Sequence, residues 1–224
     1  RSWRLRFRSM PGTFAAAVGF AIWVVFGPAE WATALAARGG IGWALEGHVE
    51  VSSTKLRAVI ADNAEYDPAH RAGYSGVAEL YHGGSPRSLF VPAYAGLNFE
   101  HVFSGDAASF GWDIFEPRKA AMTLVRAAER RVELRQERTA NWPLKSTITY
   151  ELSGDDAIDF TIACVPLADA WKKHGYIGLF FASYIDAPED MAIHFIGRSR
   201  PGKGESKPRW IRHLPPRHGE QACH

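Results

Sequence analysis

The sequence lacks the features that define several protein classes. It has two cysteines, Cys164 and Cys223, which is too few for a disulfide framework. The formal net charge is only +2, so no field over the whole molecule favours nucleic acid as a partner. The apolar run from Phe14 to Phe26 is shorter than the roughly 20 residues that a membrane-spanning helix needs. Contact with a membrane is therefore expected only through this N-terminal segment.

Familiar catalytic motifs are missing as well. The chain contains no G-x-S-x-G, H-E-x-x-H or C-x-x-C motif and no glycine-rich phosphate loop, so we expect no cofactor. Ser52-Ser53-Thr54-Lys55 fits S-x-x-K, but the companion motifs are absent and the segment has the pattern of a strand. Function must therefore be argued from scattered residues.

The N-terminal segment has the three parts of a secretory signal. Four arginines open the chain: Arg1, Arg4, Arg6 and Arg8. The apolar run follows, and then the small-residue pattern Ala34-Leu35-Ala36. Cleavage after Ala36 would remove four Arg and one Glu and change the net charge from +2 to -1. We expect residues 1–36 to be a signal peptide, or alternatively a membrane-anchoring hydrophobic helix, and the protein to be secreted or periplasmic.

Residues 141–184 show the clearest periodicity. After Asn141-Trp142-Pro143, two segments alternate between apolar and polar residues on either side of the turn Ser153-Gly154-Asp155-Asp156. The apolar positions are Ile148, Tyr150, Leu152, Ile158, Phe160, Ile162 and Cys164. This pattern predicts an antiparallel hairpin with one solvated face and a buried Cys164 thiol. The run 175–185 is apolar on both parities, which predicts a strand buried on both faces.

Other short alternating runs are separated by turn residues. They cover residues 49–53, 55–62, 77–82, 122–125, 131–135 and 191–197. Many short strands favour an all-β fold, an antiparallel β-sandwich, with residues 37–224 as one domain. Because the chain ends without a closing signal, we expect this domain to be incomplete at its C-terminal end.

Asn98, Glu100 and His101 form a polar cluster in an apolar neighbourhood. In a regular strand Asn98 and Glu100 share one face and His101 takes the other, so all three reach one cleft only where the strand ends or bulges. A carboxylate beside an imidazole suits proton transfer, because burial can bring both pKa values toward neutrality. The alternative is a salt-bridged strand end without chemistry.

Histidines and aromatic residues supply the other candidates. Four histidines lie at or next to strand ends: His82, His101, His174 and His194. A shared metal site is conceivable, but no pair sits two, three or four residues apart, so we expect no metal. Flat rings at a cleft can stack on sugars, although core packing is the alternative for each. The candidate rings are Tyr94, Trp142, Trp171 and Tyr176.

The central stretch resembles the galactose-mutarotase-like (aldose 1-epimerase-like) β-supersandwich group. Asn141-Trp142-Pro143, leading into the hairpin, is similar to one side of the sugar cleft in those enzymes. The segment 173–179 is similar to the one that carries their catalytic histidine, so the resemblance implies that His174 is a general acid and Tyr176 a cleft residue. Lys173 and Gly178 replace two asparagines of that segment, and no late general-base glutamate is identified.

Three functions therefore remain open. The first is an exported sugar epimerase or mutarotase-like protein, with His174 or His101 as acid and Glu100 as base. In this hypothesis six further residues bind the carbohydrate: Trp142, Trp171, Tyr176, Asn98, Tyr94 and His194. The second is a non-catalytic carbohydrate-binding β-sandwich, and the third is a His-based metal-dependent hydrolase or oxygenase.

Overall fold

The computed structural model describes residues 2–10, 13–15, 22–26, 47–66, 69–104, 111, 113–168, 177–186, 193–197 and 208–213. Within them the chain is mostly β-strand, with one short helix, α2 (Glu116–Lys119). The strands are β1 (Ser2–Met10), β2 (Thr13–Ala15), β3 (Ile22–Phe26), β4 (His48–Ser52), β5 (Leu56–Ala61), β6 (Gly76–His82), β7 (Asn98–Phe103), β8 (Thr123–Ala128), β9 (Arg131–Gln136), β10 (Leu144–Ser153), β11 (Ala157–Pro166), β12 (Gly178–Ile185), β13 (Ile193–Gly197) and β14 (Arg209–His213). The expectation of an all-β fold is confirmed.

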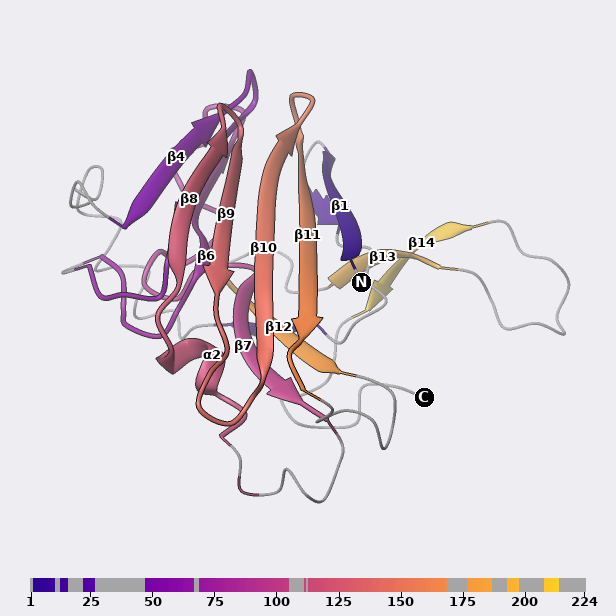
Figure 1. The fold of residues 1–224 in the computed structure, drawn as a ribbon. Coiled ribbons are helices and arrows are strands. Elements are labelled where there is room, and N and C mark those ends of the chain that lie inside the picture. Colours follow the sequence, from indigo (N-terminus) through magenta and orange to yellow (C-terminus); the bar gives the residue numbers. More distant parts are fainter. Residues whose placement is uncertain are drawn as a thin grey trace, which may run out of the picture.

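The strands form a sandwich-like arrangement of two layers (Figure 1). One layer is a six-stranded sheet with the order β2-β1-β11-β10-β9-β8. The other combines two three-stranded sheets, β4-β5-β6 and β3-β12-β7, which meet at a backbone bridge between Val77 and Gly96. Among the described strands only β3 and β12 pair in parallel, and the other pairings are antiparallel.

The central hairpin is β10 and β11, and its alternation is confirmed residue by residue. Ile148 pairs with Ile162 and Tyr150 pairs with Phe160, and all four side chains are buried. Gly154 in the connecting turn has a φ of 65°, a conformation that glycine adopts without steric cost. Because successive side chains of a strand point to opposite faces, the apolar parity of both strands faces the core.

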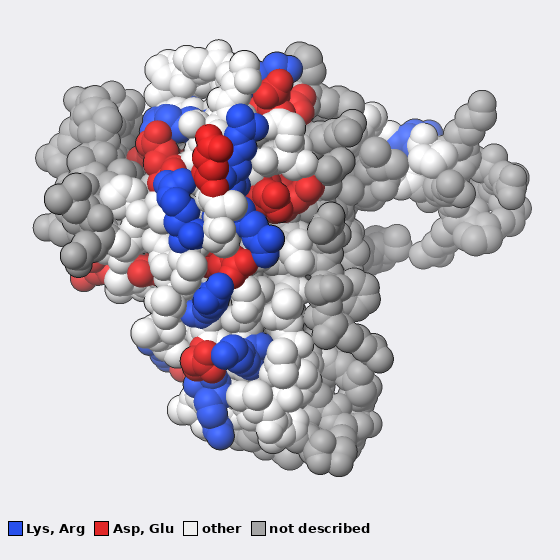
Figure 2. Space-filling model, turned by 45° about the horizontal axis from the view of Figure 1, so that its top comes forward, with Lys and Arg blue, Asp and Glu red and all other residues white. Residues whose placement is uncertain are grey.

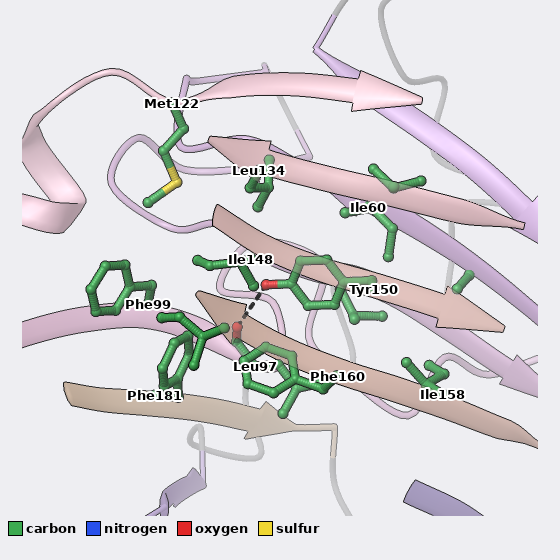
Figure 3. Packing of buried hydrophobic residues seen from close by; sticks show 14 of the residues in the cluster. Ile60, Leu97, Phe99, Met122, Leu134, Ile148, Tyr150, Ile158, Phe160 and Phe181 are labelled. Atoms are coloured by element: carbon green, nitrogen blue, oxygen red, sulfur yellow. Dashed lines mark hydrogen bonds between the residues drawn. The ribbon is translucent and has the colours of Figure 1, made fainter. Parts of the chain in front are cut away.

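The core lies between the two layers (Figure 3). Phe160 of β11 contacts Phe181 of β12 edge to face, with ring centroids 5.0 Å apart, and Phe181 stacks on Phe99 of β7 at 5.0 Å. The hydroxyl of Tyr150 donates a hydrogen bond across the core to the carbonyl oxygen of Leu97, 3.0 Å away. Burying each large apolar side chain contributes about 1.5–3 kcal/mol, so this interface holds the layers together.

β12 is less buried than the sequence predicts. The apolar run predicts burial on both faces, but only Phe181, Ala182 and Ser183 are buried, whereas the other residues of β12 are half-buried. Cys164 is also only half-buried, although it packs against the core. Burial raises the pKa of the Cys164 thiol to about 11. Cys223 lies outside the described residues.

The expected N-terminal helix is not supported. The described parts of residues 1–36 are strands, and β1 pairs with β11 so that Trp3, Leu5 and Phe7 lie opposite Ile162, Phe160 and Ile158. The physical reason is visible in the sequence, where apolar residues and arginines alternate from Trp3 to Arg8 with the period of a strand. The other residues of this segment lie outside the described ranges.

In the part of the chain that the structure describes, no helix has the length and apolar character needed to cross a membrane.

The outer face of the six-stranded sheet carries charges of both signs. Glu133 accepts hydrogen bonds from Arg131 and Arg135, each at 2.7 Å. The Arg135 guanidinium, followed by that of Arg131, lowers the pKa of Glu133 against the effect of burial. Figure 2 shows basic and acidic residues interleaved over this surface, so charges of the two signs neutralise one another locally.

Candidate functional site

A β-bulge in β7 creates the most distinctive polar cluster among the described residues. Phe180 of β12 pairs with His101, and the next residue, Phe181, pairs with Phe99. Glu100 is therefore the extra residue of β7, and its backbone has no pairing partner on β12. A bulge of this kind interrupts the alternation of side chains and redirects those beside it. The strand therefore has the bulge that Glu100 and His101 need in order to reach the same side of it.

Glu100 is the centre of the cluster. Its side chain is 7% exposed, and its Oε1 accepts hydrogen bonds from the Tyr184 hydroxyl at 2.8 Å and from Asn98 Nδ2 at 3.2 Å. Its Oε2 lies 3.6 Å from His101 Nε2, and Arg118 Nη1 lies 3.9 Å from Oε1. One carboxylate oxygen is thus held by two donors, whereas the other has a loose contact with an imidazole.

Asn98 orients Glu100. It is fully buried, and its Oδ1 accepts a hydrogen bond from the backbone N–H of Ser75 at 2.9 Å. Its amide nitrogen is the one that donates to Glu100. Because both ends of the amide are engaged and no atom is exposed, Asn98 acts as a support for Glu100 and does not fit the expected role of a ligand contact.

His101 lies between two aromatic rings. Phe180 stacks on the imidazole with centroids 4.7 Å apart, and Phe115 meets it edge-on at 4.2 Å. Burial lowers the pKa of His101, Glu100 partly offsets that effect, and Arg118 adds to it. His101 Nε2 has no hydrogen-bond partner among the described residues. The imidazole is therefore neutral at pH 7, and its Nε2 is buried beside Glu100 Oε2.

Three tyrosines border the cluster. The ring centroids of Tyr74, Tyr94 and Tyr184 are 5.1, 5.2 and 5.6 Å apart, and all three side chains are half-buried. Arg71 Nη1 donates to the Tyr94 hydroxyl at 2.9 Å. Tyr94 therefore contacts Tyr184, which in turn donates a hydrogen bond to Glu100. Burial first, and then the Glu100 carboxylate, raise the pKa of Tyr184, so its hydroxyl is protonated.

The one-turn helix α2 carries Arg118 to this cluster. The buried Glu116 accepts hydrogen bonds from Thr139 Oγ1 and from the Asn141 backbone and amide nitrogens. Asn63 Nδ2 donates to the backbone oxygens of Arg118 and Ala120, at 3.1 and 2.7 Å. A single helical turn is not stable alone. These side chains therefore hold α2 in place.

The backbone before β7 is unusual. Ala95 and Leu97 have φ values of 58° and 52°, which side chains other than glycine rarely adopt. Both residues are buried, and Leu97 is held by Ser183 Oγ, which accepts from its N–H at 2.9 Å, and by Tyr150. Conformations of this kind persist where the surroundings enforce them. Here they bring β7 into the layer immediately before Asn98.

Of the remaining candidates from the sequence, Trp142 is the one whose side chain the structure describes, and it does not join the cluster. Trp142 is 1% exposed and its Nε1 donates to the Asp113 backbone oxygen at 2.8 Å, so its ring belongs to the core and cannot stack on a ligand here. His194 lies in β13, for which only the backbone is described. Trp171, His174 and Tyr176 lie outside the described residues.

Metal binding and the S-x-x-K segment gain no support. No group of three or more His, Cys, Asp or Glu side chains in the described ranges could hold a metal ion. Ser52 to Lys55 line a surface hollow of about 490 Å³ together with Arg57 and Tyr81. This hollow is separate from the Glu100 cluster, and Arg57 in it is paired with Glu50 at 3.0 Å.

Sequence reasoning missed Arg118 and Tyr184 as members of the site. Arg118 follows Glu116-Pro117, where an acidic residue and a proline are a signal for the start of a helix. Tyr184 is one of the few polar side chains in the apolar run of β12. Neither signal reveals that these residues meet Glu100, because that depends on how the two layers are placed.

Comparison of the chain with family models, with curated proteins and with solved structures finds no match in any of the three.

Proposed function

We propose that the Glu100 cluster binds a carbohydrate and carries out acid–base chemistry on it, as a sugar epimerase or mutarotase does. The observation that carries the proposal is the pair formed by a buried carboxylate and a neutral imidazole, with Glu100 Oε2 3.6 Å from His101 Nε2. Mutarotation, which is epimerisation at the anomeric carbon, needs only the addition and removal of protons at the sugar, which side chains of this kind can supply without a cofactor.

The two groups have distinct roles in this proposal. His101 is neutral, so it accepts the proton, and Glu100 stabilises the imidazolium that forms. This differs from the sequence-based assignment of His101 as the acid, because burial removes the extra proton that an acid would need. His174 remains a candidate for the acid by resemblance alone, since it lies outside the described residues.

The surroundings suit a sugar. Tyrosine rings offer flat apolar faces, and their hydroxyls can exchange hydrogen bonds with sugar hydroxyls. Tyr74, Tyr94 and Tyr184 are all half-buried and lie within one ring contact of each other. Binding by a mutarotase-like sandwich and export from the cytoplasm belong to the same proposal; the resemblance of the central hairpin supports the first, and the signal-like pattern of residues 1–36 supports the second.

A non-catalytic carbohydrate-binding protein is the second candidate. It is favoured by the burial of Glu100, whose side chain is 7% exposed and already accepts two hydrogen bonds. In that case the carboxylate is a support for Tyr184, and the half-buried tyrosines alone contact the ligand.

Replacement of Glu100 separates these two functions. Glu100→Gln keeps the size of the side chain and removes its charge, so we expect turnover to fall about 10²–10⁴-fold while sugar binding is retained. Proton NMR of anomer and epimer exchange measures turnover over a panel of aldoses, and ligand-observed NMR measures binding. Glu137→Gln, at an exposed ion pair with Lys145, is the matched control and should leave both unchanged.

The outcomes differ clearly. A wild-type protein that binds sugars but turns none over, and whose binding is weakened by Tyr94→Ala and not by Glu100→Gln, would be a binding protein. A folded wild-type protein that binds no sugar would exclude both functions.

A further inference from the structure

The two terminal nitrogens of Arg118 form no hydrogen bond with any residue that the structure describes. Its Nε donates to the Gly73 backbone oxygen at 2.9 Å, and its guanidinium lies over the Tyr74 ring, 4.1 Å from the centroid. Within the described residues its nearest acid is Glu100, whose Oε1 is 3.9 Å from Nη1, beyond hydrogen-bond distance. The side chain is 23% exposed. The guanidinium is thus oriented, and its free edge remains accessible.

Arg71 lies on the neighbouring tyrosine. Its guanidinium is 5.4 Å from the centroid of the Tyr94 ring, which is itself 5.1 Å from the Tyr74 ring. Arg71 is exposed and forms no ion pair with any described residue. The two guanidinium groups therefore rest on adjacent rings of one aromatic cluster.

The cluster carries two guanidinium groups, Arg71 and Arg118, and one buried carboxylate, Glu100. Glu65 acts on Arg71 from nearby, whereas Arg118 has only the loose contact with Glu100 among the described acids. A half-buried guanidinium with free N–H groups favours an oxyanion over a neutral hydroxyl, because charge-assisted hydrogen bonds are roughly twice as strong as neutral ones.

The helix that carries Arg118 is held unusually firmly for its length. Buried Asn63 and Gln136 donate to backbone oxygens of α2, with Gln136 Nε2 2.8 Å from the Ala120 oxygen, and Glu116 anchors its first turn. A side chain on a rigid support loses less freedom when it binds, which increases both affinity and selectivity. Arg118 therefore has the rigid support that is expected of a side chain that recognises a ligand.

We propose that the ligand of this site is an anionic sugar, whose carboxylate or phosphate oxygens bind the free edge of Arg118 with assistance from Arg71. This inference rests on the proposed function and names its substrate class. A guanidinium presents two parallel N–H groups to either oxyanion, whereas the rest of the sugar lies against the tyrosines and reaches the Glu100–His101 pair.

The test compares three sugars on the full chain. Ligand-observed NMR titrations with glucose, glucuronate and glucose 6-phosphate measure the dissociation constants for wild type, Arg118→Gln, Arg118→Lys and Arg71→Gln. We expect at least one anionic sugar to bind at least 10-fold more tightly than glucose, and the stronger of the two identifies the oxyanion. Arg118→Gln should abolish this preference, whereas Arg118→Lys and Arg71→Gln should reduce it.

Arg135→Gln is the control, because Arg135 is paired with Glu133 on the outer face of the sheet and should leave the preference unchanged. Equal affinity for all three sugars, or a preference that survives in Arg118→Gln and Arg71→Gln, would overturn the inference and leave the proposed function standing. Binding of none of them by the folded protein would overturn both. If Arg118→Gln does not fold, the Lys and Arg71 variants still decide the question.

Discussion

Glu100 and Glu116 are both buried carboxylates, but their hydrogen bonds assign them different tasks. Both oxygens of Glu116 accept from Asn141, and Thr139 adds a further donor. Burial alone would raise the pKa of Glu116, but these hydrogen bonds outweigh it and lower the pKa. Glu100 has donors on one oxygen only and a titratable neighbour at the other. A carboxylate whose two oxygens both accept hydrogen bonds is typical of a structural anchor. Proton transfer needs a carboxylate oxygen that is not already held by donors.

The protonation of His101 gives a prediction at this scale. Its pKa in the folded protein lies below the unfolded value of about 6.5, so the unfolded chain binds a proton more readily. The stability linked to His101 is therefore fully present above about pH 6.5 and is lost as the pH falls through the lowered pKa. Turnover that uses neutral His101 should show an acidic limb below pH 6.5.

Urea unfolding and turnover, each measured between pH 4.5 and 8, test this prediction. In His101→Asn, the part of the pH dependence of the unfolding free energy that comes from His101 should disappear, and turnover should be lost. The control variant His82→Asn should keep the acidic limb of turnover. An acidic limb centred above pH 6.5 would contradict the neutral imidazole.

At the scale of elements, α2 shows how a short helix is stabilised by its surroundings. Four residues cannot form a stable helix by propensity, and here Pro117 begins the turn while Asn63 and Gln136 satisfy its free carbonyl groups. The element is thus determined by side chains from three other parts of the chain. Its position decides where Arg118 lies.

Glu116→Gln should therefore affect stability and binding together. The amide cannot accept hydrogen bonds at both ends, so donors of Asn141 and Thr139 lose a charged partner. We expect the free energy of unfolding to fall by about 2–3 kcal/mol. Urea denaturation measures this loss.

Glu137→Gln serves as the control and should change the free energy of unfolding by less than about 1 kcal/mol, because its ion pair is exposed. If α2 positions Arg118, sugar affinity should also fall in Glu116→Gln under conditions where that variant is fully folded. Unchanged affinity would show that Arg118 does not depend on this anchor.

At the scale of the whole molecule, the N-terminal strands extend both layers of the sandwich. β1 pairs with β11 in the six-stranded sheet, and β3 pairs with β12 in the other layer. Without them β11 and β12 would become edge strands, with unpaired backbone groups that favour association. This arrangement competes with the expectation that residues 1–36 are removed as a signal peptide.

Truncation to residues 37–224 distinguishes these views. If the strands belong to the fold, the shortened protein should melt at a lower temperature than the full chain and should associate in size-exclusion chromatography. A deletion of residues 214–224, which leaves every described strand in place, is the matched control. A truncated protein as stable and monomeric as the full chain would favour a removable signal segment.

The strands could be predicted because their signal is local. The apolar parity of β10 and β11 predicts their buried face, and the turn at Gly154 is marked by its residue types. The same alternation is present from Trp3 to Arg8, but the apolar run that follows it led to the interpretation as a basic flank. The basic and apolar composition of this segment is that of a signal peptide, although its alternation from Trp3 to Arg8 is that of a strand.

The candidate site could be predicted only in part. The sequence identified Asn98, Glu100 and His101 as one cluster, because residues close in the chain must lie close in space. It also required a bulge without locating one, since a bulge depends on the partner strand β12. Trp142 was misassigned because an aromatic residue next to a hairpin can face either the core or the solvent.

The sequence by itself determined the central hairpin of β10 and β11, the face that these two strands turn to the core, and the carboxylate–imidazole neighbours on β7. Only the tertiary structure decided which oxygen of Glu100 is open and that Tyr184 and Arg118 reach it. The physical reason is that periodicity encodes burial along one element, whereas contacts between elements depend on sheet order, on the bulge and on the anchoring of α2.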